Sequence, residues 1–225
     1  MKKIFKFIKN VIIICVLIGL IVIGYITYDG YKLYKEVIAK ESIEQKVNQI
    51  KEDKWYLSFD EIPKDFSIAI VSVEDHRFFK HCGIDLMSIG RAIEKNIKAK
   101  RLVEGGSTIT QQLAKNMYFN FDKKFSRKIA ELFVAFDLES KYKKQEILSM
   151  YINVIYFGNG YYGLNEASNG YFDKSVDKLT FDEITLLAGL PNAPSAFSLN
   201  DNLDLAKKRQ KLVQDAIKKF NVVID

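Results

Sequence analysis

An apolar run near the N-terminus limits what this chain can fold into. From Val11 to Tyr28 there are 18 residues without a charge, and they are rich in Ile and Val. A helix of that length spans roughly the 30 Å hydrocarbon layer of a bilayer. A buried core helix is disfavoured because all faces of the run are apolar and no polar stripe marks a solvent side. The run therefore predicts a transmembrane helix at residues 11–28.

A cleaved signal peptide is the closer alternative, because four lysines among residues 1–10 supply a basic region ahead of the run. The residues after Gly24 show no small-x-small cleavage pattern, which favours an uncleaved anchor. By the positive-inside rule, the four lysines place residues 1–10 in the cytoplasm and the chain after Asp29 outside. We therefore expect a single-pass protein of the cell membrane with an extracytoplasmic domain.

The charge and the cysteine content argue against nucleic-acid binding, a disulfide framework and a zinc site. The net charge of +6 drops to +2 without the four N-terminal lysines, so the exported part is nearly neutral. Generic nucleic-acid binding loses its support, and no nucleic-acid partner is expected. Cys15 lies in the apolar run and Cys82 in the exported part, so they are not expected to pair. The sequence has neither a disulfide framework nor a zinc-ligand spacing.

The rest of the chain is predicted to be mainly α. Residues 29–55 are rich in Lys, Glu and Gln and predict a polar helical stalk, followed by one domain over residues 56–225. Residues 66–73 form an apolar run that fits either a strand or a buried helix. Residues 85–99 combine apolar residues at helical spacing with basic ones. This segment fits either an amphipathic helix on anionic lipid or a solvated helix packed on the core.

Two carboxylates, Glu74 and Glu131, bracket a stretch whose composition core packing does not explain. Glu74 follows an apolar segment, where desolvation can raise the pKa of a carboxyl group. The glycines Gly105 and Gly106 allow the backbone to approach a ligand closely. Hydroxyl and amide side chains suited to oxygen-rich ligands such as sugars follow them. These are Ser107, Thr108, Thr110, Gln111 and Gln112.

Five cations follow within fourteen residues, with Asp122 as the one intervening acid. They are Lys115, Lys123, Lys124, Arg127 and Lys128. Such a cluster would complement a pyrophosphate, although a solvated turn also accounts for Lys123 and Lys124. Sugar transfer requires two acids on separate rigid elements, but a single Glu more often has a surface or salt-bridge role.

Together these motifs resemble those of the peptidoglycan glycosyltransferases, glycosyltransferase family 51, in their monofunctional membrane-anchored form. The resemblance covers roughly residues 57–219 and rests on five ordered motifs. The motifs are Glu74-Asp75-x-x-Phe78-x-x-His81-x-Gly83, the run from Gly106 to Asn116, Arg127-Lys128-x-x-Glu131, Glu146-Ile147-Leu148-x-x-Tyr151-Ile152-Asn153 with Tyr156-Phe157-Gly158, and the run from Leu187 to Ser195.

The resemblance implies a lysozyme-like helical head with a small membrane-proximal jaw. It also implies an enzyme of peptidoglycan synthesis and cell-wall growth, which polymerises lipid II with inversion and releases undecaprenyl pyrophosphate. Glu74 matches the family's general base, and Glu131 matches the second acid, which assists the departing pyrophosphate directly or through a divalent ion. Because the chain stops soon after the last motif, a monofunctional enzyme without a transpeptidase domain is expected.

The same resemblance implies the substrate-binding residues and partners. The implied substrate-binding residues are Arg91, Ser107, Thr108, Gln112, Lys115, Lys123, Arg127 and Lys128. The expected partners are lipid II, the growing glycan strand and the cytoplasmic membrane, with other cell-wall synthases as candidates. No cofactor is evidently obligatory, and a divalent metal such as Mg or Mn at Glu131 is left open. Lys123 departs from the arginine that many members carry there and lacks its bidentate fork.

Two alternatives use the same residues differently. A lysozyme-like hydrolase or lytic transglycosylase would also need a carboxylate and a sugar groove. The cationic cluster argues against it, since cleavage of a polymer involves no pyrophosphate. The other alternative is a non-catalytic membrane scaffold that binds lipid II. The presence of both acids argues against a scaffold, and a turnover assay distinguishes a scaffold from an enzyme.

Overall fold

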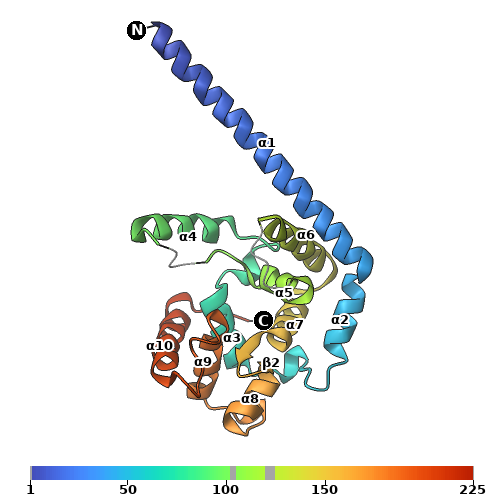
Figure 1. The fold of residues 1–225 in the computed structure, drawn as a ribbon. Helices are drawn as coiled ribbons and strands as arrows, with labels where there is room; N and C mark the ends of the chain where they lie inside the picture. Colours follow the sequence, from blue (N-terminus) through green and yellow to red (C-terminus); the bar gives the residue numbers. More distant parts are fainter. Residues whose placement is uncertain (1, 102–104, 120–124, 225) are drawn as a thin grey trace.

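The structure is a computed structural model that describes residues 2–101, 105–119 and 125–224, with side chains from residue 4 onward. It is mainly α, as predicted, with a long N-terminal helix leading away from a helical head (Figure 1). The α-helices are α1 (Lys2–Lys40), α2 (Ile43–Lys51), α3 (Lys64–Glu74), α4 (Leu86–Ala99), α5 (Ile109–Tyr118), α6 (Phe125–Lys141), α7 (Lys144–Val154), α8 (Leu164–Phe172), α9 (Phe181–Gly189) and α10 (Leu203–Phe220).

Short elements connect the helices. Four 3-10 helices are described, η1 (Phe59–Glu61), η2 (Phe78–Lys80), η3 (Val176–Lys178) and η4 (Leu190–Asn192). The strands β1 (Tyr156–Gly158) and β2 (Tyr161–Tyr162) form an antiparallel hairpin in which Tyr156 pairs with Tyr162. α7 therefore ends at Val154, before the hairpin, and the chain turns at glycines with positive φ such as Gly158 and Gly160.

The predicted transmembrane segment is part of one continuous helix. α1 has 39 residues and is roughly 58 Å long. Within the described chain it is the one helix long and apolar enough to cross a membrane, and none of the apolar window is buried by the protein. The free half of α1 points away from the head (Figure 1). The second half of the helix packs against α6.

Gly30 lets α1 and α6 approach closely. A Cβ atom built at Gly30 would lie 2.5 Å from Ile129 Cβ and 2.7 Å from the carbonyl oxygen of Ser126. One helical turn further on, the Tyr34 hydroxyl donates a hydrogen bond to Asp137 Oδ2 at 2.6 Å. The anchor helix is thereby fixed to the head through side-chain and backbone contacts.

Substitution of Gly30 is expected to loosen this attachment. Gly30→Ala should destabilise the folded chain by about 1–3 kcal/mol, because the added methyl group overlaps α6. Gly24→Ala is the matched control, since a Cβ atom at Gly24 meets nothing within 4 Å. Thermal unfolding in detergent measures both variants. Equal melting temperatures for the two variants would contradict the close crossing of α1 and α6.

The segment expected to form a polar stalk packs on the head instead of standing clear of it. Residues 29–55 are largely helical, but α2 buries Ile43 and Val47 in the hydrophobic core. The helix begins at a capping box in which the Ser42 hydroxyl accepts from the backbone N–H of Gln45. Apolar residues at positions 43 and 47 share one face of the helix, and burial of that face outweighs the polar composition of the segment.

Residues 66–73 lie within α3, so this apolar run is a buried helix and not a strand. Pro63 precedes its first turn, where a missing N–H costs no helical hydrogen bond. Phe66 and Ile70 of α3 are fully buried and join the core with Leu113 of α5 and Tyr151 of α7. α3 thus carries its last residue into the middle of the head.

α4 lies at the edge of the head on the side toward the free half of α1 (Figure 1). Ala92 is its one buried residue, whereas Leu86 and Ile97 are 72% and 71% exposed. The apolar face of α4 therefore does not pack on the core of the described head, which removes one of the two interpretations of residues 85–99. Contact of this face with lipid stays a prediction.

Candidate active site

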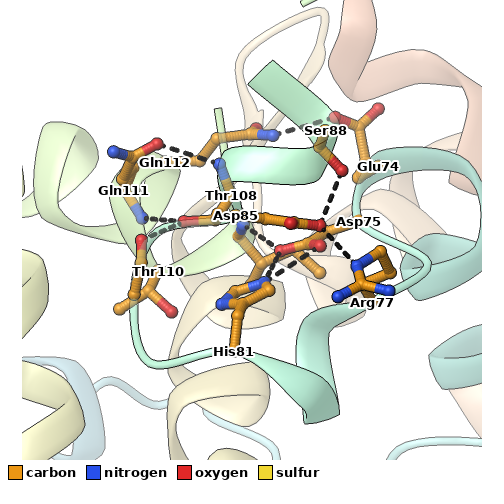
Figure 2. Close-up of polar contacts among 12 residues, drawn as sticks. Glu74, Asp75, Arg77, His81, Asp85, Ser88, Thr108, Thr110, Gln111 and Gln112 are labelled. Carbon is orange, nitrogen blue, oxygen red and sulfur yellow. Dashed lines mark hydrogen bonds and ion pairs between the residues drawn. The ribbon is translucent and has the colours of Figure 1, made fainter. Parts of the chain in front are cut away.

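Glu74 is the last residue of α3 and is largely withdrawn from solvent, with 9% of its side chain exposed. Its Oε2 accepts a hydrogen bond from Gln112 Nε2 of α5 at 2.9 Å (Figure 2). Its Oε1 lies 3.5 Å from Arg209 Nη2 of α10. Three helices that are distant in sequence therefore surround one carboxyl group.

Burial raises the pKa of Glu74 above its ordinary value of 4.5. The hydrogen bond from Gln112 and the charge of Arg209 act in the opposite direction, and the neighbouring Asp75 adds a smaller upward effect. Desolvation is the largest of these effects, so the pKa remains raised. A carboxylate in this state takes up a proton more readily than an exposed one, as a general base requires.

Tyr151 fixes the orientation of the Gln112 amide. Its hydroxyl donates a hydrogen bond to Gln112 Oε1 at 3.0 Å, which leaves the amide nitrogen directed at Glu74. Tyr151 is fully buried, and burial raises the pKa of its hydroxyl well above the ordinary value, so it remains protonated as a donor. This chain of hydrogen bonds holds Glu74 in one position.

Asp75 and Thr108 organise the start of α5. Asp75 points away from Glu74 to His81 Nε2 at 2.9 Å and accepts from the backbone N–H of Ile109 at 3.0 Å (Figure 2). The Thr108 hydroxyl caps α5 and donates to the carbonyl oxygen of Gly83 at 2.7 Å. Thr108 is 2% exposed, so its hydroxyl is engaged within the protein.

Thr108→Ala is expected to lower stability by about 2 kcal/mol, because it removes a helix cap and leaves a buried carbonyl group unpaired. Thr108→Ser retains the hydroxyl and should keep most of the stability. Thermal unfolding of the two variants measures the difference. An alanine variant with unchanged melting temperature but a raised KM would show that Thr108 acts through a ligand instead.

Glu131 is buried among cations on α6. It is 1% exposed, with Lys128 Nζ 2.8 Å from its Oε2 and Arg127 Nε 3.3 Å from its Oε1. Lys128 Nζ also donates to Ser107 Oγ at 2.8 Å. One buried acid therefore holds two cations at the beginning of α6, which compensates its own desolvation.

A divalent ion would find a single carboxylate at Glu131, and that carboxylate already contacts two cations. Across the described chain, no group of three or more His, Cys, Asp or Glu side chains could hold a metal ion. These residues do not by themselves fit a metal site, because an ion there would take its other ligands from substrate or water.

A cavity of about 520 Å³ joins the two acids. Its lining includes most of the side chains that the sequence singled out: Glu74, Ser107, Gln112, Lys115, Arg127, Lys128 and Glu131. Thr108 and Arg91 do not line it. Arg91 lies on α4, where its guanidinium reaches His76 at 3.3 Å and Ser88 at 3.2 Å. Lys123 lies outside the described residues.

Sequence reasoning missed Arg209. Its one visible signal is that it is the sole arginine among the lysines of residues 203–220. Nothing local connects that helix to Glu74, and only the packing of α10 on α3 brings the guanidinium into the cavity. Pro191 and Asn192, which belong to a quoted motif, also line the cavity.

Comparison with known proteins identifies the family of this chain. A family model described as Transglycosylase matches residues 40–218. Penicillin-binding protein 1F of Bacillus subtilis (strain 168) is 42% identical over 199 residues, which cover 87% of this chain and 28% of that protein. Penicillin-binding protein 1A of Aquifex aeolicus (strain VF5) is 42% identical over 160 residues, covering 71% of this chain and 22% of that protein.

This chain thus spans about a quarter of the length of these relatives. The match nevertheless extends from the end of α1 to the last turn of α10 and includes the residues that line the cavity. The chain belongs to the transglycosylase family, the peptidoglycan transglycosylase domains of glycosyltransferase family 51.

Proposed function

We propose that this chain is a peptidoglycan glycosyltransferase that polymerises lipid II into glycan strands and releases undecaprenyl pyrophosphate. One observation carries the proposal. A single cavity is lined by a desolvated carboxylate, Glu74, and by a second acid, Glu131, which contacts two cations. Family membership supports the transferase class, and the two acids fit the two halves of the reaction.

Glu74 is the base for the acceptor. The 4-hydroxyl oxygen of the acceptor lipid II attacks the anomeric carbon of the donor, the bond from that carbon to the pyrophosphate breaks, and the hydroxyl proton passes to Glu74. Glu74 Oε1 is buried and has no hydrogen-bond partner among the described residues, whereas Oε2 is held by Gln112. One oxygen therefore fixes the group while the other takes the proton.

The cations around Glu131 stabilise the leaving pyrophosphate. Arg127 and Lys128 are held by Glu131, and Lys115 lines the same cavity. Fixed positive charge at the developing negative charge of a leaving group is commonly the largest contribution to catalysis. Ser107 and Gln112 line the same cavity and would contact sugar hydroxyl groups of the bound substrate.

The anchor helix fits a lipid-linked substrate. With the basic N-terminus in the cytoplasm, α1 would cross the bilayer and hold the head against its outer surface, where the diphosphate of lipid II lies. α1 packs directly on α6, the helix that carries Glu131. Other cell-wall synthases remain candidate partners at this surface.

Purified full-length chain in detergent with lipid II tests the proposal. We expect glycan polymer as the product, assayed both with added Mg²⁺ or Mn²⁺ and with a chelator to determine the metal requirement. Preformed peptidoglycan should yield no fragments. Release of fragments would identify a hydrolase. If the chain bound lipid II but made no polymer, with or without added metal, it would be a scaffold.

A further inference from the structure

Arg209 is a buried cation that the proposed reaction scheme leaves without a role. It lies in the middle of α10, its side chain is 15% exposed, and it lines the cavity beside Glu74. Burial of a guanidinium group is costly unless a partner compensates it. The carboxylate that the structure places beside it is that of Glu74, with Nη2 and Oε1 3.5 Å apart.

We propose that Arg209 is the positioning residue that keeps Glu74 ionised and its free oxygen directed into the cavity. The inference rests on the proposed role of Glu74 as the base. A base that is protonated at working pH cannot accept the acceptor's proton. Arg209 favours the charged form of Glu74 by its own charge.

The charged groups around Glu74 divide by element. On α3 itself, Asp75 adds negative charge but is engaged with His81. On α6, the cations Arg127 and Lys128 contact Glu131. The remaining polar groups are Gln112 and Lys115 on α5, Tyr151 on α7 and Arg209 on α10. Among these, Arg209 is the cation whose charge lowers the pKa of Glu74 against the effect of burial.

The 3.5 Å separation suits this role. Arg209 lies close enough to act on Oε1 by charge, yet Oε1 has no hydrogen-bond partner among the described residues. A short hydrogen bond from the guanidinium would occupy the lone pair that must take the proton. Charge without a hydrogen bond keeps Glu74 ionised and still available as a base.

The surrounding helices hold Arg209 in place. A Cβ atom at Gly189 of α9 would lie 3.0 Å from Arg209 Cγ, so the glycine leaves room for the arginine stem. Next to it, Gln210 Nε2 donates to the carbonyl oxygen of Asp182 at 2.9 Å and to Thr185 Oγ1 at 3.1 Å. These buried hydrogen bonds fix the register of α10 on α9 and thereby the position of Arg209.

The test is the pH dependence of kcat with lipid II for Arg209→Met, Arg209→Lys and the control Lys208→Met. Lys208 is the exposed neighbour on the same helix. Arg209→Met should move the acidic limb of the profile upward by roughly one pH unit. At a given pH on that limb, kcat of Arg209→Met should be about tenfold below that of the wild type, and the difference should disappear at higher pH. Arg209→Lys retains the positive charge and should show a smaller shift than Arg209→Met, and Lys208→Met should match the wild type.

Three outcomes overturn the inference. The first is an unchanged pH profile for Arg209→Met. The second is a loss of kcat in Arg209→Met that is equal at every pH, which indicates a structural role. The third is the same profile for Arg209→Lys and Arg209→Met. Thermal unfolding of each variant identifies a folding defect. Failure of the proposed function is distinguishable, because then the wild type makes no polymer or Glu74→Gln remains active.

Discussion

Glu74→Gln is expected to reduce polymerisation of lipid II by about 10²- to 10⁴-fold, the range that general-base catalysis contributes. Glutamine has nearly the same shape and can still accept the hydrogen bond from Gln112, so the variant should fold and remain anchored. It cannot take up the proton of the acceptor hydroxyl. The initial rate of glycan synthesis and the melting temperature together measure the effect.

Asp65→Asn is the matched control for Glu74→Gln, since Asp65 is an exposed acid on the same helix. It should leave the rate unchanged. A Glu74→Gln variant that still makes glycan at the wild-type rate would show that another group is the base.

The pH dependence of the wild type follows from the same group. The ionised form of Glu74 is the active form, so the rate falls as the pH drops through its pKa. Because burial raises that pKa above 4.5, the loss should begin at a higher pH than an exposed glutamate would give. The acidic limb should be absent from the residual rate of Glu74→Gln.

Glu131→Gln is expected to lower kcat by about 10²- to 10³-fold, because it weakens stabilisation of the leaving pyrophosphate. The neutral amide would no longer hold Lys128 and Arg127 in place, and their charges would move relative to the pyrophosphate. Stability should fall by less than the roughly 3–5 kcal/mol typical of a broken buried pair. The reason is that the Lys128 side chain is already 41% exposed and can be solvated.

Glu44→Gln is the control for this variant, because Glu44 forms an exposed pair with Lys141 on another part of α6. Steady-state rates and thermal unfolding compare the two variants. If Glu131→Gln raised KM with kcat unchanged, Glu131 would act in substrate binding and not on the leaving group.

Several features could be predicted because short-range interactions decide them. The apolar run at residues 11–28 predicted a membrane-spanning helix, and α1 contains it within a longer helix. The spacing of Thr180 and Glu183 is that of a capping box, which opens α9, and α10 spans Leu203–Phe220 with apolar residues at helical spacing. A cap or an amphipathic stripe depends on residues within one or two turns, so sequence spacing is sufficient.

The environment of each side chain could not be predicted in the same way. The sequence offered Thr108 as a sugar ligand, but its hydroxyl is occupied in capping α5 and in binding Gly83. Residues 29–55 were expected to form a polar stalk, but α2 buries two apolar residues against the head. In both cases the partner lies on a distant part of the chain.

The sequence by itself determined the anchor, the helical class and the two acids with the cationic cluster between them. Tertiary structure alone decided the surroundings of Glu74. Glu74 is desolvated, Tyr151 orients the Gln112 amide that binds Glu74, and Arg209 lies beside Glu74. The physical reason is that the pKa of a carboxyl group depends on its burial and on charges within a few ångströms. Those distances are set by how α3, α5, α7 and α10 pack together.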